Sequence, residues 1–462
     1  MEEHARTDEV TWDRARERAL AVGFALAVGA GVWGLARWSG LLALGCAALA
    51  GGGLLLVGHP EVFLSLYVFA GIFKGHPLLA LPSGFDWTMM LGVAAVFAIV
   101  LRATIVAKLR LLRVQAADLF LGGLLLVLLL GLLYSRDVEY GLSEWLELAT
   151  LGVLAAYALP RVIALVSNPN RVGMNVLRTV FGLGLGLSAA VLLGFGASAR
   201  SFAGNYLSWG TFQGVASVAA AGLVHLARRR TTKCLIVGLI PVLLAGMVLA
   251  RARGPLISLA GVAMLWLLAR GRTSRWRKAA VVAVLVAIIG GIFALNPSAW
   301  WRYSLLFSVD KGTSIDVRVE AYRLAGALFL RHPIIGAGTG SFRHYASGVS
   351  GSGLSYPHNA ILHVLSENGV LGGVFYGGWL VALFMLYLRG VRNRGVSEER
   401  RQLLHVSFLV FMFLLVGSQL SGGIMGRAQL FFGGLVVLLA SSPETRVPAS
   451  PGVASCNGRL KQ

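Results

Sequence analysis

Long apolar segments recur along almost the whole chain, and they limit its fold more than any other feature. Segment 119–133, LFLGGLLLVLLLGLL, has no charged residue and is typical of them. A helix needs about 20 mostly apolar residues to cross the hydrocarbon core of a bilayer. Transmembrane strands would alternate apolar and polar residues over about ten positions, and these segments do not alternate. We therefore predict an all-α polytopic membrane protein.

With this length criterion we predict about 12 to 14 transmembrane helices, with boundary errors of several residues. The candidate segments are 19–36, 39–57, 60–80, 86–101, 117–134, 141–160, 174–195, 211–227, 233–250, 255–269, 279–296, 369–388, 404–420 and 426–441.

The composition agrees with this class and excludes others. Hydrophobic residues make up 56% of the chain and charged residues only 13%, whereas a soluble domain has about 25% charged residues. A soluble enzyme, a disordered chain and a nucleic-acid-binding module are therefore excluded. The net charge of +21 is explained by Lys and Arg in loops at one membrane face. We expect membrane lipids, and no nucleic acid, as partners.

The distribution of basic residues predicts which side of the membrane each loop faces. Cytoplasmic loops carry an excess of Lys and Arg, and most of the 41 such residues share one side when the first span starts in the cytoplasm. We therefore expect both termini in the cytoplasm. The predicted order is a cytoplasmic tail (1–18), a transmembrane bundle (19–296), a long extracytoplasmic segment (297–368), C-terminal transmembrane helices (369–441) and a cytoplasmic tail (442–462).

The long segment 297–368 is unusual, because the other connections are short. Loops of this length inside a compact bundle are usually functional or disordered, and its aromatic-rich composition does not indicate disorder. The pattern predicts an amphipathic helix over 314–333, a turn at 336–342 and a flexible or lid-like stretch at 348–357. The chain then re-enters the membrane through 358–373.

Two arginines at the outer end of a predicted span need a physical reason. Arg251 and Arg253 lie in LARARGPLISL, just before Gly254 and Pro255. An arginine near the bilayer must reach the interface, pair with another group or face a cavity. Its planar guanidinium suits phosphate, and a helix start also favours anions. Interface snorkelling and an anion site are both open on this evidence.

The extracytoplasmic segment supplies further candidates. Arg318 lies on the predicted helix with Asp316 and Glu320 nearby, so an ion-paired helix face is one interpretation of it. These acids and Asp310 show no metal-binding spacing, and we predict no metal. His358 stands at the mouth of a span, where an imidazole can act as a base near neutral pH. We interpret Glu367 as a buried orienting or capping group.

The sequence HNAILHVLSENGVLGG resembles the signature of the O-antigen ligase and O-antigen polymerase family of bacterial membrane glycosyltransferases. That signature is His-Asn-x-x-Leu, four residues, then Glu-x-Gly-x-x-Gly. Every position of it is filled, by His358, Asn359, Leu362, Glu367, Gly369 and Gly372.

Three upstream elements extend the resemblance over about residues 250–373. RHPIIGAGTGSF is similar to the family's His-Pro and Gly-x-Gly element, and VRVEAYRLAGALFL places Arg318 on the family's helix arginine. RGPLISL resembles a Ser-Arg-Gly element with Arg253 on its arginine. Ala252 replaces the serine of that element, and Pro255 follows its glycine.

The resemblance implies a GT-C-like fold and a reaction on the outer side of the bacterial inner membrane. Family members take a glycan from undecaprenyl pyrophosphate. Ligases transfer it to a hydroxyl of lipid A-core, and polymerases transfer it to another lipid-linked repeat. No nucleotide sugar, metal or other cofactor is implied. We favour the ligase, with the polymerase as the alternative, and a polysaccharide transporter or flippase as the contrasting class.

The resemblance also implies roles for individual residues of the catalytic segment. His358 would activate the acceptor hydroxyl, because a hydroxyl gains from a base within hydrogen-bond reach. Arg253 and Arg318 would bind the pyrophosphate, whose departure builds negative charge. Direct attack at the anomeric carbon would invert its configuration. Supporting roles fall to Asn359, Glu367 and Arg251, and the sugar-facing aromatics would be Tyr303, Tyr345 and Tyr356.

Overall fold

The computed structural model describes most of the chain from His59 to Ser441. The described ranges are 59–72, 113–166, 168–192, 206–269, 313–350 and 354–441, with short pieces at 88, 91–93, 95–96, 283 and 286–294. Both predicted tails, the first two predicted spans and Tyr303 lie outside the described residues. Within those ranges every regular element is a helix.

Seven helices of the described residues are long and apolar enough to cross a membrane. They are Ala116–Tyr134, Val138–Ala164, Pro169–Ala190, Tyr206–Leu226, Arg230–Leu249, Ala360–Arg392 and Glu398–Ser421. Two shorter apolar helices, α12 (Arg253–Ala269) and α19 (Arg427–Ser441), accompany them. These helices confirm the predicted all-α polytopic class, and the chain is a multi-pass membrane protein.

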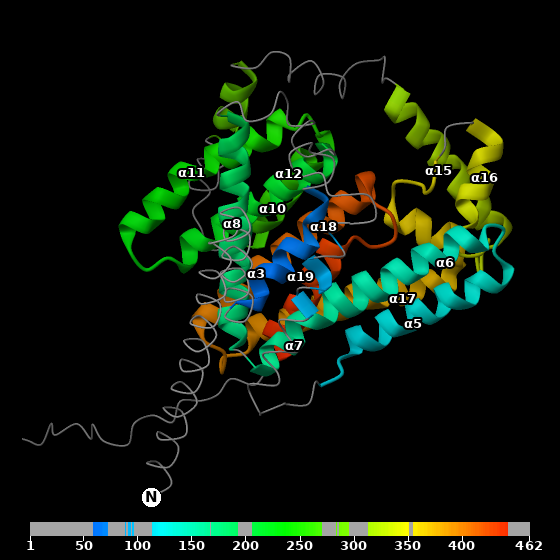
Figure 1. Cartoon of the computed structure of the whole chain (residues 1–462), viewed down its shortest axis with the longest axis horizontal. Coiled ribbons are helices and arrows are strands. Elements are labelled where there is room, and N and C mark those ends of the chain that lie inside the picture. The colour runs from blue at the N-terminus through cyan, green and yellow to red at the C-terminus, as the bar shows by residue number, and fades with distance from the viewer. Residues whose placement is uncertain are drawn as a thin grey trace, which may run out of the picture.

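The helices form two groups that meet along α18 (Glu398–Ser421) and α19. In one group, α10 (Tyr206–Leu226) packs against α8 (Pro169–Leu192), α11 (Arg230–Leu249) and α12. In the other, α17 (Ala360–Arg392) packs along α5 (Ala116–Gly131), with α6 (Val138–Leu146) beside them (Figure 1). Since α18 contacts α10, and α19 contacts α17, these two helices join the groups into one core.

Glycines let the helices of this core approach closely. A β-carbon at Gly214 of α10 would overlap the ring of Phe413 on α18, and one at Gly222 would overlap Val406. On the other side, Gly123 of α5 leaves room for the ring of Phe375 on α17. Small residues at helix contacts increase van der Waals packing, which is a main source of helix association in membranes.

Two helices outside the spans form a small second core. The structure confirms the predicted amphipathic helix as α15 (Thr313–Arg331). The turn and flexible stretch predicted for 336–357 are partly wrong, because Ser341–Ser350 form a helix, α16. Buried residues pack α15 and α16 together: Ala321, Ala325, Leu328, Ala337, Phe342 and Ala346. Both helices also contact α17.

Helix α17 begins at Ala360, before the predicted span 369–388 and within the stretch 358–373 through which the chain was predicted to re-enter the membrane. It contains a break at Gly369 with φ 61° and ψ −159°. The break leaves backbone amides and carbonyls of α17 without partners inside the helix, and the turn before α16 forms hydrogen bonds with them. The carbonyls of Ser366 and Glu367 accept from the amides of 337 and 338, at 3.0 and 2.9 Å. The amides of 370 and 371 donate to the carbonyls of 333 and 334, at 2.8 and 3.1 Å. Turn and helix are therefore one hydrogen-bonded unit.

Candidate functional site

His358 is held in an unusual backbone conformation directly before α17. Its φ of 59° lies in the left-handed region, which costs a non-glycine residue on the order of 1 kcal/mol. The next residue holds it there. Asn359 Oδ1 accepts from the amide of Leu362 at 2.9 Å, and its Nδ2 donates to the carbonyl of Gln419 at 3.1 Å. Asn359 therefore fixes His358 against the ends of both α17 and α18.

Arg318 reaches the same place from α15. Its Nη2 donates to the hydroxyl of Ser421 at 3.2 Å, at the last residue of α18. Burial lowers the pKa of the His358 imidazole below its usual value, and the positive charge of Arg318 is the second largest cause of this shift. A hydrogen bond with the Ser421 backbone opposes the shift only in part. His358 is therefore neutral at pH 7 and able to accept a proton.

The start of α12 also lies beside Ser421. A β-carbon at Gly254 would stand 3.7 Å from Ser421 Oγ and 3.8 Å from Leu420 Cβ. Arg253 is the first residue of this helix and is half-buried, whereas Arg251 is exposed, with φ 57°. The structure thus brings the segments that carry His358, Arg318 and Arg253 together around one serine.

A cavity of about 590 Å³ opens beside these residues. Its wall is formed by several helices and by the glycine-rich connection between α18 and α19. The wall residues that matter here are Tyr140, Glu144, Gly254, Tyr356, Ser421 and Arg427. A cavity of this size with a few convergent polar groups is typical of a ligand site.

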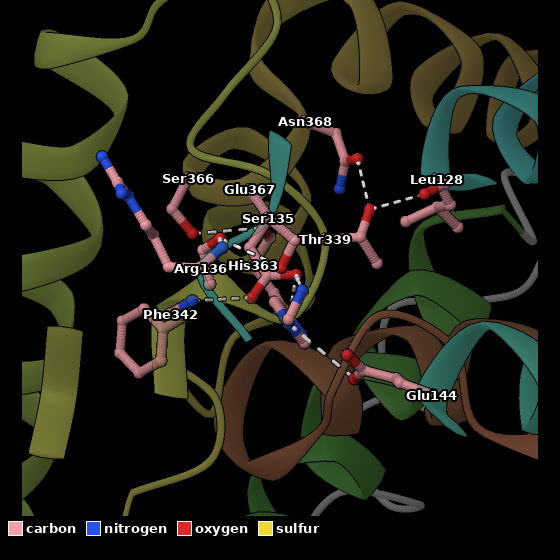
Figure 2. A network of polar contacts seen from close by, with 12 residues as sticks. Leu128, Ser135, Arg136, Glu144, Thr339, Phe342, His363, Ser366, Glu367 and Asn368 are labelled. Atoms are coloured by element: carbon pink, nitrogen blue, oxygen red, sulfur yellow. Dashed lines mark hydrogen bonds and ion pairs between the residues drawn. The ribbon is translucent and has the colours of Figure 1, made fainter. Parts of the chain in front are cut away.

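A second polar cluster lies next to the cavity and links α6 to α17. His363 Nε2 is 3.4 Å from Glu367 Oε2 and 3.8 Å from Glu144 Oε1 (Figure 2). His363 and Glu367 are fully buried. These three residues are also the group, among those that the structure describes, whose ligand atoms lie close enough to hold a metal ion.

Glu367 caps the helix that sequence analysis did not predict. Its Oε2 accepts from the amide of Gly340 at 2.8 Å and its Oε1 from the amide of Phe342 at 2.9 Å, at the start of α16. A carboxylate there satisfies amides that lack helical partners and complements the helix dipole. The predicted buried capping position of Glu367 agrees with this geometry. Each oxygen of the Glu367 carboxylate therefore accepts a hydrogen bond from a backbone amide.

The turn that carries these amides is attached to α5 as well. Thr339 Oγ1 donates to the carbonyl of Leu128 at 2.8 Å and lies 3.1 Å from Asn368 Oδ1 (Figure 2). The amide of Arg136 donates to the hydroxyl of Ser341 at 2.9 Å. The turn is therefore fixed between α5, the segment just before α6, and α17.

Sequence reasoning did not single out Glu144, His363 or Ser421 as site residues. A signal for Glu144 existed, because it is an ionisable residue inside the predicted span 141–160, and such residues usually face a cavity or a partner. Among the predicted aromatics, Tyr356 lines the cavity. Tyr345 packs instead against the second core.

Comparison with known families identifies the central part of the chain. Residues 238–377 match the family model described as O-antigen ligase. We call the matched residues 238–377 the O-antigen ligase domain. This match confirms the resemblance predicted from the sequence, and it supports a function of the O-antigen ligase and polymerase type. A search of curated proteins finds no match.

The O-antigen ligase domain contains every site residue that the sequence predicted. It runs from within α11 through α12, α15 and α16 to the middle of α17. Glu144 and Ser421 lie outside it, on α6 and α18. The site is therefore completed by helices that the family model does not cover.

Proposed function

We propose that this protein is an O-antigen ligase. It transfers a glycan from undecaprenyl pyrophosphate to a sugar hydroxyl of lipid A-core, on the outer side of the bacterial inner membrane. The observation that carries the proposal is the meeting of a neutral imidazole, His358, with the guanidinium of Arg318 at Ser421, beside a cavity. A base and a fixed cation are the two groups that this transfer requires.

In the proposed reaction, the acceptor hydroxyl oxygen attacks the anomeric carbon of the donor while its proton passes to His358. The bond between that carbon and the pyrophosphate oxygen breaks, and both electrons leave with the undecaprenyl pyrophosphate. Arg253 and Arg318 stabilise the charge that develops on the leaving group. Attack opposite the leaving group inverts the anomeric configuration. The protonated His358 then returns its proton to water.

The supporting residues position this machinery. Asn359 fixes the backbone at His358 through its two hydrogen bonds. Glu367 holds the start of α16 against α17. Arg251 is exposed beside the start of α12, where it would attract the donor phosphates from the interface.

The test is a transfer assay with purified protein in nanodiscs and a lipid-linked glycan donor. One reaction contains lipid A-core, and a second contains only further lipid-linked glycan. We expect glycosylated lipid A-core in the first, and a loss of at least 100-fold in kcat for His358→Ala, the scale of general-base contributions. His344→Ala is the matched control, since His344 is exposed on α16.

Three results would contradict the proposal in different ways. Elongated lipid-linked glycan in the second reaction, with no transfer to lipid A-core, would make the protein a polymerase. Near-normal turnover by a folded His358→Ala variant would remove the base role. Unchanged donor binding by both Arg253→Ala and Arg318→Ala would remove the pyrophosphate site.

A further inference from the structure

The cavity extends beyond the residues that the proposed reaction uses. Besides Tyr356 and Ser421, its wall includes Glu144 and Tyr140 of α6. A carboxylate is a poor neighbour for pyrophosphate, because like charges repel. Glu144 is therefore unsuited to the donor's leaving group, which the proposed function assigns to Arg253 and Arg318.

One oxygen of Glu144 lacks a partner within the described structure. Its Oε1 faces His363 at 3.8 Å, while its Oε2 is buried and accepts no hydrogen bond from the described residues. Buried polar atoms are nearly always hydrogen-bonded, so an unpaired one needs an explanation. A carboxylate oxygen can only accept, so a donor group from a ligand would satisfy it.

The orientation of Glu144 is built up from fixed groups. Two backbone amides hold Glu367, and His363 Nε2 lies 3.4 Å from Glu367 Oε2 and 3.8 Å from Glu144 Oε1, so one ring nitrogen faces both carboxylates. Because His363 and Glu367 are fully buried, neither has room to turn away. The carboxylate of Glu144 is therefore preorganised at the cavity wall.

The aromatic ring of Tyr356, which lines the same cavity as Glu144, lies close to the proposed base and to His363. The ring centroid of Tyr356 is 4.6 Å from that of His358, and 6.1 Å from that of His363, to which it is nearly parallel. A sugar resting near Tyr356 could offer one hydroxyl to His358 and another to Glu144. An aromatic ring with carboxylate acceptors suits a carbohydrate, which has apolar faces and hydroxyl donors.

We propose that Glu144, oriented by His363, binds a hydroxyl of the acceptor sugar next to the one that reacts. This inference rests on the proposed transferase function and adds a residue for acceptor recognition from outside the O-antigen ligase domain. Glu144 acts in binding, and His363 is a positioning residue.

The experiment measures steady-state transfer by wild-type protein, Glu144→Gln and Glu139→Gln. Glu139 lies on the same helix and is exposed, so its variant is a matched control for charge loss on α6. We expect Glu144→Gln to raise the KM for the acceptor at least 10-fold and to change the KM for the donor less than twofold. Glu139→Gln should change neither.

A second measurement needs no variant. Dicyclohexylcarbodiimide labels carboxyl groups in apolar surroundings, and mass spectrometry locates the label. We expect acceptor glycan to protect Glu144 of the wild-type protein, and donor alone to protect it less. This measurement decides the matter if Glu144→Gln does not fold.

The outcomes separate this inference from the proposed function. No transfer by wild-type protein to any acceptor would refute the proposed function itself. Transfer by wild-type protein, with an unchanged acceptor KM in folded Glu144→Gln or no protection of Glu144, would refute only the inference. A stoichiometric metal ion that purified wild-type protein holds and Glu144→Gln loses would also overturn it, because the cluster would then be a metal site.

Discussion

Glu367→Gln should destabilise the unit formed by α16 and α17 although it changes the side chain's shape very little. The carboxylate accepts from two backbone amides, at 2.8 and 2.9 Å. A glutamine offers one oxygen, so its amide nitrogen must face the second backbone amide, donor to donor. An unsatisfied buried donor costs about 1–3 kcal/mol. The remaining bond loses its charge assistance, about 1 kcal/mol more.

We therefore expect a loss of about 2–4 kcal/mol in the free energy of unfolding, without counting the contact with His363. The assay is equilibrium unfolding of purified protein in mixed micelles, followed by tryptophan fluorescence. Glu320→Gln is the control, because Glu320 is exposed on α15. A Glu367→Gln protein within about 0.5 kcal/mol of wild type, the ordinary range of surface substitutions, would refute this account of the cap.

Two further predictions concern the turn and the base. Gly336→Ala should destabilise the protein by more than about 1 kcal/mol in the same unfolding assay. The reason is that Gly336 has φ 76° and that a β-carbon there would overlap the backbone of Glu367. A variant as stable as the wild type would contradict this description of the turn. Since the pKa of His358 is lowered from its ordinary value, the acid limb of kcat/KM should lie at a lower pH than the titration of a free imidazole. Removing the positive charge in Arg318→Ala should move this limb upward, and a downward shift would contradict the assigned cause.

The membrane class and the spans that fall within the described residues could be predicted because a single local property, apolar length, determines them. The predicted helix 314–333 was also correct, since its apolar spacing and the following proline are local signals. Helix α16 was missed because its surroundings are rich in glycine and because its cap comes from Glu367, a residue of another helix.

Some residues of the candidate site could likewise be predicted from local sequence, and others could not. Motif residues such as His358 and Arg318 could be named from the sequence, and the structure brings them together at Ser421. Glu144 belongs to no motif, and only the packing of α6 against the turn and α17 places it near His363. No pattern along the chain carries that information, because the two residues are far apart in sequence.

The break at Gly369 has a consequence for biosynthesis. In a lipid environment the freed carbonyls and amides of α17 would be costly without partners, and their partners lie in the turn at 333–338. That turn precedes α17 in the chain, so the ribosome completes it first. The partners of the broken helix therefore already exist when the helix itself emerges. A rearranged chain that encoded the turn after α17 would insert the helix with its break unprotected.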